Sequence, residues 1–288
     1  MIWLIGNKGM LGQELSNILL QSDIKFFGTD REVDIRNPAT LRAYSAGKSI
    51  DWIINCSAYT AVDKAEEEED IARSINALGA GNIAQVANEI GATMIHISTD
   101  YVFNGGGSKP YLESDSVDPQ SAYGRTKAEG EALVATLCPQ HFIVRTAWLY
   151  GKYGPNFVTT MLKLMKEKTS ISVVNDQYGT PTWAYDLAMV IFSIVTINSD
   201  KYGIYHFTNA GETTWFEFAV DIQCFGRELG LLNQGCKVLS ITSSQYPSKV
   251  QRPAWSVLSK EKIIKDLGVT PPEWKTSLKL YLMGIKYS

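Results

Sequence analysis

The stretch MIWLIGNKGMLG, residues 1–12, decides the fold of this chain. Its first five residues are continuously apolar, which is typical of a strand covered on both faces. Gly6, Gly9 and Gly12 follow at intervals of three, and the helical pattern QELSNILL comes next. Glycines at such a turn let the backbone approach a pyrophosphate, whose charge the amides at the start of the helix stabilise. The stretch predicts a dinucleotide-binding turn, although its spacing is GxxGxxG and not GxGxxG.

Apolar strands alternate with helical patterns as far as about residue 150. A helix is expected over residues 66–90, which begin with four glutamates suited to the positive end of a helix dipole. This rhythm predicts an α/β fold of the Rossmann type, a doubly wound parallel sheet with helices on both faces. The expected strands are residues 1–5, 24–29, 51–55, 92–98 and 141–146.

The pattern changes after residue 150, where loops lengthen, strands shorten and prolines become frequent. We therefore expect residues 1–150 to form a dinucleotide-binding domain. Residues 151–288 should form mainly a smaller, mixed α/β, substrate-binding part, with some segments returning to the first domain. Ligands of open α/β sheets lie beyond the carboxyl ends of the strands, so candidate site residues are those that follow each strand.

The composition excludes several classes of partner. The chain has 288 residues, 45% of them hydrophobic, and its 27 basic and 30 acidic residues leave a net charge of -3. Neither nucleic acid nor a membrane surface is expected, because both require a basic patch. The apolar start lacks a basic n-region, a cleavage site and the length of a spanning helix, so a cytoplasmic protein is expected.

The cysteines and histidines do not suggest a metal site. The four cysteines are widely spaced, with no CxxC pair, and are expected to be reduced thiols. His96, His141 and His206 lie in or beside apolar, strand-like segments, so we interpret them as core or strand-edge residues whose hydrogen bonds are satisfied.

The second strand ends near an acid that suits a nicotinamide cofactor. Asp30 lies about 20 residues beyond the glycine turn, where an acid binds the adenosine ribose hydroxyls of NAD. Arg31 could instead accept the 2′-phosphate of NADP, so the expected cofactor is NADPH or NADH. Later turns at the same edge supply candidates for adenine and for phosphate or ribose, with ordinary loop roles left open: Asp34, Ile35, Ala58, Tyr59 and Thr60.

A tyrosine and a lysine four residues apart, Tyr123 and Lys127, open a helical stretch after the strand at 92–98. Residues at this spacing share one face of a helix. Reduction of a ketone needs a hydride on carbon and a proton on oxygen, and a phenol with a pKa near 10 is a poor acid at neutral pH. We expect Lys127 to lower the pKa of Tyr123 and to bind the cofactor ribose. Thr99, which ends the strand, is expected to hold the carbonyl oxygen.

The same Tyr-x-x-x-Lys spacing occurs a second time, at Tyr44 and Lys48. That copy contains Gly47 and does not follow a strand ending in a hydroxyl-rich loop, so we expect a structural helix end. The catalytic interpretation of Tyr123 and Lys127 therefore depends on their surroundings and not on the bare motif.

Segments along almost the whole chain carry a family resemblance. They are GNKGMLG at 6–12, CSAYTAVDKAE at 56–66, SINALGAGNIA at 74–84, STDYVFNG at 98–105, YGRTK at 123–127, RTAWLYG at 145–151, DQYGTPT at 176–182 and RPAWSVLS at 252–259. With these segments the sequence resembles the extended short-chain dehydrogenase/reductases, and within them the dTDP-4-dehydrorhamnose reductases.

That resemblance implies reduction of the C4 keto group of dTDP-4-dehydro-6-deoxy-L-mannose to give dTDP-L-rhamnose, a nucleotide sugar for cell-surface polysaccharide. Thr99, Asp100, Tyr123 and Trp148 would face the sugar, and Arg252 would suit a diphosphate through its forked donors. A turn cap for Asp100 and core packing for Trp148 remain the alternatives. The residues implied in cofactor binding are Gly9, Met10, Leu11, Asp30, Asp34, Ile35, Ala58, Tyr59, Thr60, Tyr123 and Lys127.

Two departures from the family pattern affect assembly and substrate choice. The resemblance implies a possible homodimer with glutamates around magnesium at its contact. Glu14 matches one such position, but Tyr185 stands where another acid is expected, so we predict no metal site. Trp255 occupies the usual Asn position of the segment at 252–259, where nucleotide contacts or substrate choice should differ.

Two rival functions remain open. A sugar-nucleotide epimerase or dehydratase would share this fold, but dehydratases usually carry Glu after the Asp that follows the threonine, and Tyr101 stands there. The other rival is a non-catalytic regulatory binding subunit. It would not need to keep Thr99, Tyr123 and Lys127, which are all intact.

Overall fold

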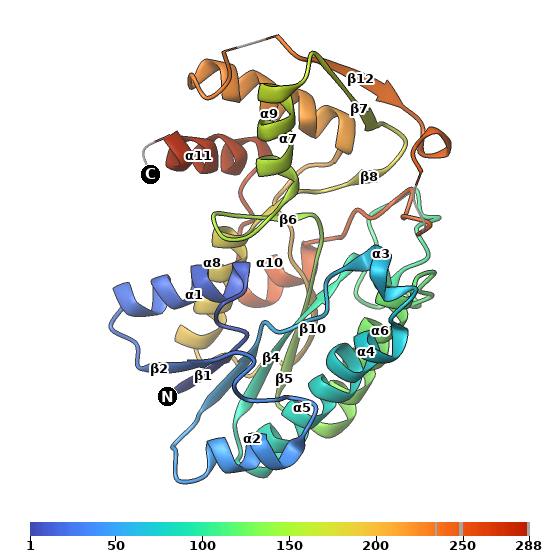
Figure 1. Ribbon diagram of the computed structural model, residues 1–288. Helices are drawn as coiled ribbons and strands as arrows, with labels where there is room; N and C mark the ends of the chain where they lie inside the picture. Colours follow the sequence, from blue (N-terminus) through green and yellow to red (C-terminus); the bar gives the residue numbers. More distant parts are fainter. Residues whose placement is uncertain (234, 248–249, 287–288) are drawn as a thin grey trace.

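A six-stranded parallel sheet forms the centre of the protein, in the order β10-β5-β4-β3-β1-β2 (Figure 1). The computed structural model describes residues 1–233, 235–247 and 250–286. The chain starts one strand in from an edge of the sheet, adds β2 as that edge and then crosses to β3 on the other side of β1. The switch between β1 and β3 is where a doubly wound sheet binds its ligand. The strands are β1 (Ile2–Ile5), β2 (Phe26–Thr29), β3 (Trp52–Asn55), β4 (Thr93–Thr99), β5 (His141–Thr146) and β10 (Gly203–His206).

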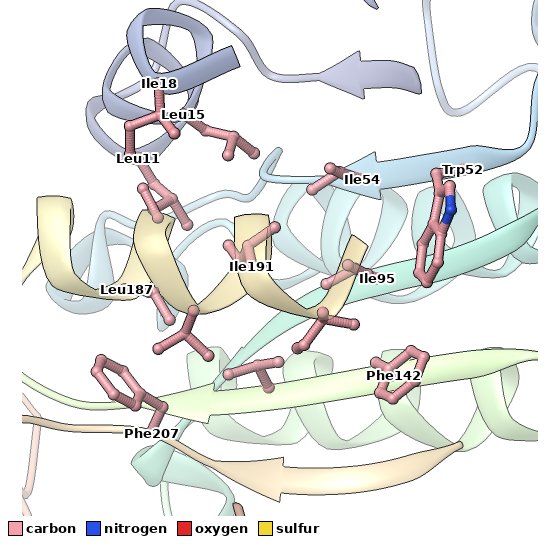
Figure 2. Close-up of a cluster of buried hydrophobic side chains, with 14 of the residues drawn as sticks. Leu11, Leu15, Ile18, Trp52, Ile54, Ile95, Phe142, Leu187, Ile191 and Phe207 are labelled. Atoms are coloured by element: carbon pink, nitrogen blue, oxygen red, sulfur yellow. The ribbon is translucent and has the colours of Figure 1, made fainter. Parts of the chain in front are cut away.

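Helices cover both faces of this sheet, as the Rossmann prediction requires. Successive residues of β1 point to opposite faces, with Leu4 in one apolar cluster and Trp3 in the other. Figure 2 shows the first cluster, in which Leu15 and Leu187 pack over the sheet. The helices of this face are α1 (Met10–Gln21), α8 (Ala184–Thr196) and α10 (Glu261–Leu267); those of the opposite face include α2 (Pro38–Ser45), α5 (Ala80–Glu89) and α6 (Ala122–Leu137).

The helix expected over residues 66–90 is interrupted, and that prediction was wrong in its start and its continuity. The segment contains α4 (Glu69–Arg73), a π-helix η1 (Ser74–Gly79) and α5, after a short α3 (Val62–Ala65). The glutamate run still forms a solvated helix start, because Glu66 and Glu67 are exposed and Glu69 begins α4. Its side chains also bind α6. Glu66 accepts the amide hydrogen of Ala122 at 2.8 Å, and Glu69 pairs with Arg125.

The remainder of the chain lies beyond the carboxyl ends of the strands (Figure 1). It packs around an apolar cluster separate from the two on the sheet faces; because this cluster belongs to the second half of the chain, we name it the second cluster. Three elements from beyond residue 150, α8, β10 and α10, belong to the layers of the central sheet. No helix among the described residues is long and apolar enough to cross a bilayer. The other elements are η2 (Asp100–Val102), β6 (Leu149–Tyr150), α7 (Phe157–Glu167), β7 (Ser170–Val174), β8 (Tyr178–Gly179), β9 (Thr182–Trp183), β11 (Thr213–Thr214), α9 (Trp215–Glu228), β12 (Lys237–Ile241), η3 (Ser243–Gln245) and α11 (Trp274–Lys286).

Replacement of Gly12 by alanine should unfold the start of α1. A Cβ at this position would overlap the carbonyl oxygen of Gly6 and lie 2.7 Å from Cα of Asn7. We expect a loss of about 3 kcal/mol in the free energy of unfolding, seen as a melting temperature roughly 5–10 °C lower by circular dichroism. Gly284→Ala in α11 is the matched control, because its Cβ would meet nothing within 4 Å. The prediction is wrong if both variants melt like the parent protein.

Candidate active site

The glycine turn leaves the start of α1 open to a ligand. Gly9 is the N-cap residue, no side chain caps the helix, and its first turn contains no acid. The amides of Met10 and Leu11 are therefore not bound by a capping side chain, as an anion site requires. The other two glycines allow close packing: a Cβ at Gly6 would lie 2.7 Å from the amide nitrogen of Ser57, and Gly12 adjoins the carbonyl of Gly6. This cradle fits the pyrophosphate of a dinucleotide.

The turn after β2 contains a second acidic residue beside Asp30 that the sequence did not single out. Glu32 accepts the amide hydrogen of Asp30 at 2.9 Å, while the exposed Arg31 makes no contact that restrains it among the described residues. Asp34 is bound in a bidentate pair by Arg36, with both distances 2.8 Å, and this pairing lowers the pKa of its carboxyl group.

Two further cofactor candidates differ in their surroundings. Ile35 is buried and packs where a side chain on Gly79 would otherwise lie. The predicted loop of Ala58, Tyr59 and Thr60 follows β3 at the same sheet edge. Ile35 therefore shapes this edge through packing, whereas the loop remains accessible at Thr60.

Asn76 is a site-building residue that the sequence analysis missed. Its side chain lies in η1, is 1% exposed, and accepts the amide hydrogen of Tyr59 at 2.8 Å. The amide nitrogen of the same side chain donates to the carbonyl of Tyr59 and to the hydroxyl of Thr126. Asn76 thus ties the loop after β3 to α6. An asparagine within an apolar helical pattern was the available signal.

The three predicted catalytic residues lie at one sheet edge. Thr99 ends β4, whereas Tyr123 and Lys127 lie in the first two turns of α6. Ser121 caps that helix by accepting the amide hydrogen of Gly124 at 3.1 Å. Thr99 and Lys127 are buried, and the half-buried Tyr123 lies near enough to Thr99 for the threonine hydroxyl to affect its pKa.

The electrostatics of Tyr123 differ from the prediction. Burial raises its pKa to about 12; the nearby hydroxyl of Thr99 acts in the opposite direction, and the charge of Asp100 adds to the increase. Lys127 forms no hydrogen bond with Tyr123 among the described residues. The expectation that the lysine lowers the pKa of the phenol was therefore wrong, because desolvation is the dominant effect. The phenol keeps its proton at neutral pH.

Lys127 is buried to 1% exposure, and its Nζ donates to the carbonyl of Ile97 at 2.7 Å. Burial lowers the pKa of this amine to about 8, while Glu131 and Cys56 act in the opposite direction. Glu131 is itself bound by Arg145 at 2.7 Å. The only other group at hydrogen-bond range of Nζ in the described part of the chain is the imidazole of His96.

Asp100 is a buried acid beside these residues. The side-chain cap of the turn after β4 is Thr99, which accepts the amide hydrogen of Tyr101. The hydroxyl of Thr99 donates to Oδ1 of Asp100 at 3.0 Å, whereas the other oxygen, Oδ2, is buried without a partner. Burial raises the pKa of Asp100 to about 6. An unsatisfied buried acceptor at this edge can receive a substrate hydroxyl.

Trp148 follows β5 in a left-handed conformation, with φ of 48°. Its indole stacks on Trp215 of α9, with centroids 3.6 Å apart and planes inclined by 12°. The other contact is Gly179, where a side chain would collide with the indole ring. The half-buried Trp148 thus joins the end of the central sheet to the second cluster.

Arg252 lines a pocket of about 230 Å³. One of its terminal nitrogens lies 3.2 Å from the carboxylate of Asp63, and its Nε is buried without a partner. The guanidinium therefore keeps donor capacity for an anion. The pocket is lined by Tyr101, Phe103, Asn104, Gly105, Gly106, Gln120, Ser121, Gln251, Arg252, Pro253 and Ala254.

Residues 1–286 match the family model described as the RmlD substrate binding domain. The chain belongs to this family. A dTDP-4-dehydrorhamnose reductase of Escherichia coli (strain K12) is 38% identical, over 98% of this chain and 96% of that protein. The match confirms the resemblance found in the sequence.

Two solved structures of the same kind share the fold. A dTDP-4-dehydrorhamnose reductase of Clostridium acetobutylicum superposes with a TM-score of 0.93, at 42% identity and 99% coverage of both chains. That of Bacillus anthracis, in complex with NADP, has a TM-score of 0.92, 36% identity and 98% coverage of both. The Rossmann-type fold is therefore confirmed.

Trp255, Glu14 and Tyr185 are the residues at which the sequence was compared with the family pattern for substrate choice and assembly. Trp255 donates from its indole to the carbonyl of Lys109 at 2.8 Å and packs against Gly107, so it holds the glycine loop beside the Arg252 pocket. Glu14 is 8% exposed, and burial raises the pKa of its carboxyl group. Tyr185 is 38% exposed and contacts Trp183.

Replacement of Asp100 by asparagine should stabilise the folded protein at alkaline pH. The folded-state pKa of about 6 lies above the ordinary value of 3.8. Ionisation of the buried acid therefore destabilises the fold progressively as the pH rises from about 4 to 6, and this penalty disappears below about pH 3. We expect a gain on the order of 3 kcal/mol at pH 8 that vanishes by about pH 3, measured by urea unfolding. The control is Asp200→Asn at an exposed position; an equal gain at both pH values would contradict the argument.

Proposed function

We propose that this chain is an NAD(P)H-dependent reductase that converts the C4 keto group of dTDP-4-dehydro-6-deoxy-L-mannose to the hydroxyl group of dTDP-L-rhamnose. The observation that carries the proposal is the placement of Thr99, Tyr123 and Lys127 at the carboxyl edge of the sheet. The open start of α1 lies at the same edge. The full-length match to dTDP-4-dehydrorhamnose reductases supports the substrate class.

The cofactor would be held by the turns that follow β1, β2 and β3. The amides of Met10 and Leu11 bind its pyrophosphate, and the turn from Asp30 to Ile35 binds the adenosine half. The loop from Ala58 to Thr60 contacts its phosphate or ribose, and Lys127 binds the nicotinamide ribose. When bound, the cofactor supplies the hydride that reaches the carbonyl carbon.

The proton for the carbonyl oxygen comes from Tyr123. A phenol with a pKa of about 12 is fully protonated at neutral pH, so it is present in its donor form. The alkoxide that forms on reduction is a stronger base than a phenolate, and it takes the proton without a prior lowering of the pKa. Thr99 lies near Tyr123 and orients the same oxygen.

The sugar nucleotide would lie between the sheet edge and the second cluster. Asp100 offers its unpartnered oxygen to a sugar hydroxyl, and Trp148 presents its indole to the sugar. Arg252 donates to the diphosphate from the pocket beside the glycine loop. In this proposal residues 1–150 bind mainly the cofactor and residues 151–288 bind mainly the sugar nucleotide. Two copies of the chain form a homodimer, which light scattering can test.

One assay separates this function from its rivals. The purified protein is incubated with the 4-keto sugar nucleotide and NADPH or NADH, and both absorbance at the reduced-nicotinamide band and the sugar product are followed. Stoichiometric cofactor oxidation with formation of dTDP-L-rhamnose is the expected result. Turnover without net oxidation would indicate an epimerase, and cofactor binding without turnover would indicate a regulatory subunit.

Tyr123→Phe should remove the proton donor and leave the cofactor site in place. We expect kcat to fall at least 100-fold, while the dissociation constant of NADPH, measured by fluorescence, changes less than threefold. Tyr44→Phe, in the second Tyr-x-x-x-Lys copy, is the matched control and should keep full activity. Near-normal turnover of Tyr123→Phe would exclude this tyrosine as the donor.

Arg252→Lys should weaken binding of the sugar nucleotide more than it slows the reaction. Lysine keeps the charge but loses the forked donors that match a diphosphate. We expect KM for the sugar nucleotide to rise about tenfold, equivalent to about 1.4 kcal/mol, with kcat within threefold of the parent value. The remote Arg42→Lys, which alters a surface pair with Glu89, serves as control. An unchanged KM for Arg252→Lys would place the diphosphate elsewhere.

A further inference from the structure

His96 is a completely buried histidine at the centre of β4. Its Nδ1 lies 3.1 Å from the side-chain nitrogen of Asn55, its register partner on β3, and its Nε2 lies 3.4 Å from Nζ of Lys127. The histidine is satisfied on one side, as expected from the sequence. On the other side it faces the lysine of the proposed active site.

The orientation of Asn55 assigns the tautomer of this histidine. The side-chain oxygen of Asn55 accepts the amide hydrogen of Ser57 at 3.0 Å and also its hydroxyl hydrogen. A backbone amide can only donate, so the oxygen of Asn55 faces Ser57 and its NH₂ group faces the ring. Nδ1 of His96 is therefore an acceptor, and a neutral imidazole then carries its proton on Nε2.

The ring stays neutral in these surroundings. Burial and the charge of Lys127 hold the pKa of His96 well below its ordinary value. Its Nε2–H group is then a donor that faces Nζ, which is itself a donor when Lys127 is an ammonium. The distance of 3.4 Å suits such a contact, because it exceeds the usual N–H···acceptor separation.

We propose that His96 is a positioning residue for Lys127. Its Nε2–H group faces the buried ammonium and offers it no acceptor on the side of the sheet, so the free N–H groups of Lys127 point toward the ligand. The carbonyl of Ile97 binds one of the three N–H groups of Lys127. Glu131 is engaged by Arg145 and the thiol of Cys56 remains neutral, so neither replaces the missing acceptor. The other two N–H groups can then bind the cofactor ribose and place positive charge near Tyr123. This inference rests on the proposed function.

Asn55→Asp tests the tautomer without a change in His96. A carboxylate in this position accepts from both Ser57 and Nδ1, so the imidazole proton moves to Nδ1 and Nε2 becomes an acceptor for Lys127. We expect kcat to fall at least tenfold and the dissociation constant of NADPH to rise at least tenfold. His96→Phe supplies no acceptor either, so its losses in kcat and NADPH affinity should be at least fivefold smaller than those of Asn55→Asp.

The double variant Asn55→Asp/His96→Phe separates the tautomer from the added charge. It keeps the carboxylate but removes the ring nitrogen, so kcat and NADPH affinity should recover at least fivefold relative to Asn55→Asp. The control is His141→Gln on the neighbouring strand β5, whose parent ring bonds the carbonyl of Cys138 at 2.7 Å and does not contact Lys127; it should match the parent protein. Failure of the double variant to recover would mean that charge, and not the tautomer, impairs Lys127.

Nitrogen-15 NMR of the histidines in the full-length protein reads the tautomer directly, without catalysis. The signals of His96 are assigned by their loss in His96→Phe. The parent protein should show His96 protonated on Nε2, and Asn55→Asp should show it protonated on Nδ1. A parent ring protonated on Nδ1 overturns the inference. If the parent protein does not reduce the ketone, the proposed function fails, and the NMR spectrum and NADPH affinities still decide the role of His96.

Discussion

The close packing of α6 against the chain that leaves β4 is the constraint on which the proposed active site depends. Gly124 allows the helix to touch the carbonyl of Tyr101, and Gly130 allows it to touch the carbonyl of Asn76 in the π-helix; a side chain at either position would overlap these oxygens. Tyr123 and Lys127 lie between or beside these two contacts. Their positions relative to the end of β4 are therefore fixed by backbone contact, which is stiffer than a side-chain hydrogen bond.

Burial moves four titratable groups around the end of β4 toward their neutral forms. It raises the pKa of Tyr123 and Asp100 and lowers those of Lys127 and His96. Proteins compensate such desolvation with partners, but Asp100 keeps an unpartnered oxygen and Lys127 has one carbonyl acceptor. In the proposed function, the substrate and the cofactor supply these missing hydrogen-bond partners. A protonated phenol beside a weakly solvated ammonium is suited to give a proton to a developing alkoxide.

Local signals predicted the fold and half of the site. The apolar strands at 51–55 and 141–146 were identified almost to their ends, because continuous burial leaves a clear pattern, and the edge after each strand supplied Thr99 and the glycine turn. Contacts between distant segments left no such pattern. His96 looked like a core residue because only its approach to Lys127 distinguishes it. The bonds of Glu66 and Glu69 to α6 could not be predicted, because their partners lie 56 residues further along the chain.

The second half of the chain is coupled to the sheet edge through strain at Trp148. A tryptophan in the left-handed region costs of order 1–3 kcal/mol and persists only where its surroundings impose it. Here the stack on Trp215 and the close approach of Gly179 impose it, and both come from beyond residue 150. The indole therefore takes its place only when the second cluster has packed on the sheet. The left-handed conformation of Trp148 and the packing of the second half of the chain on the sheet are therefore coupled.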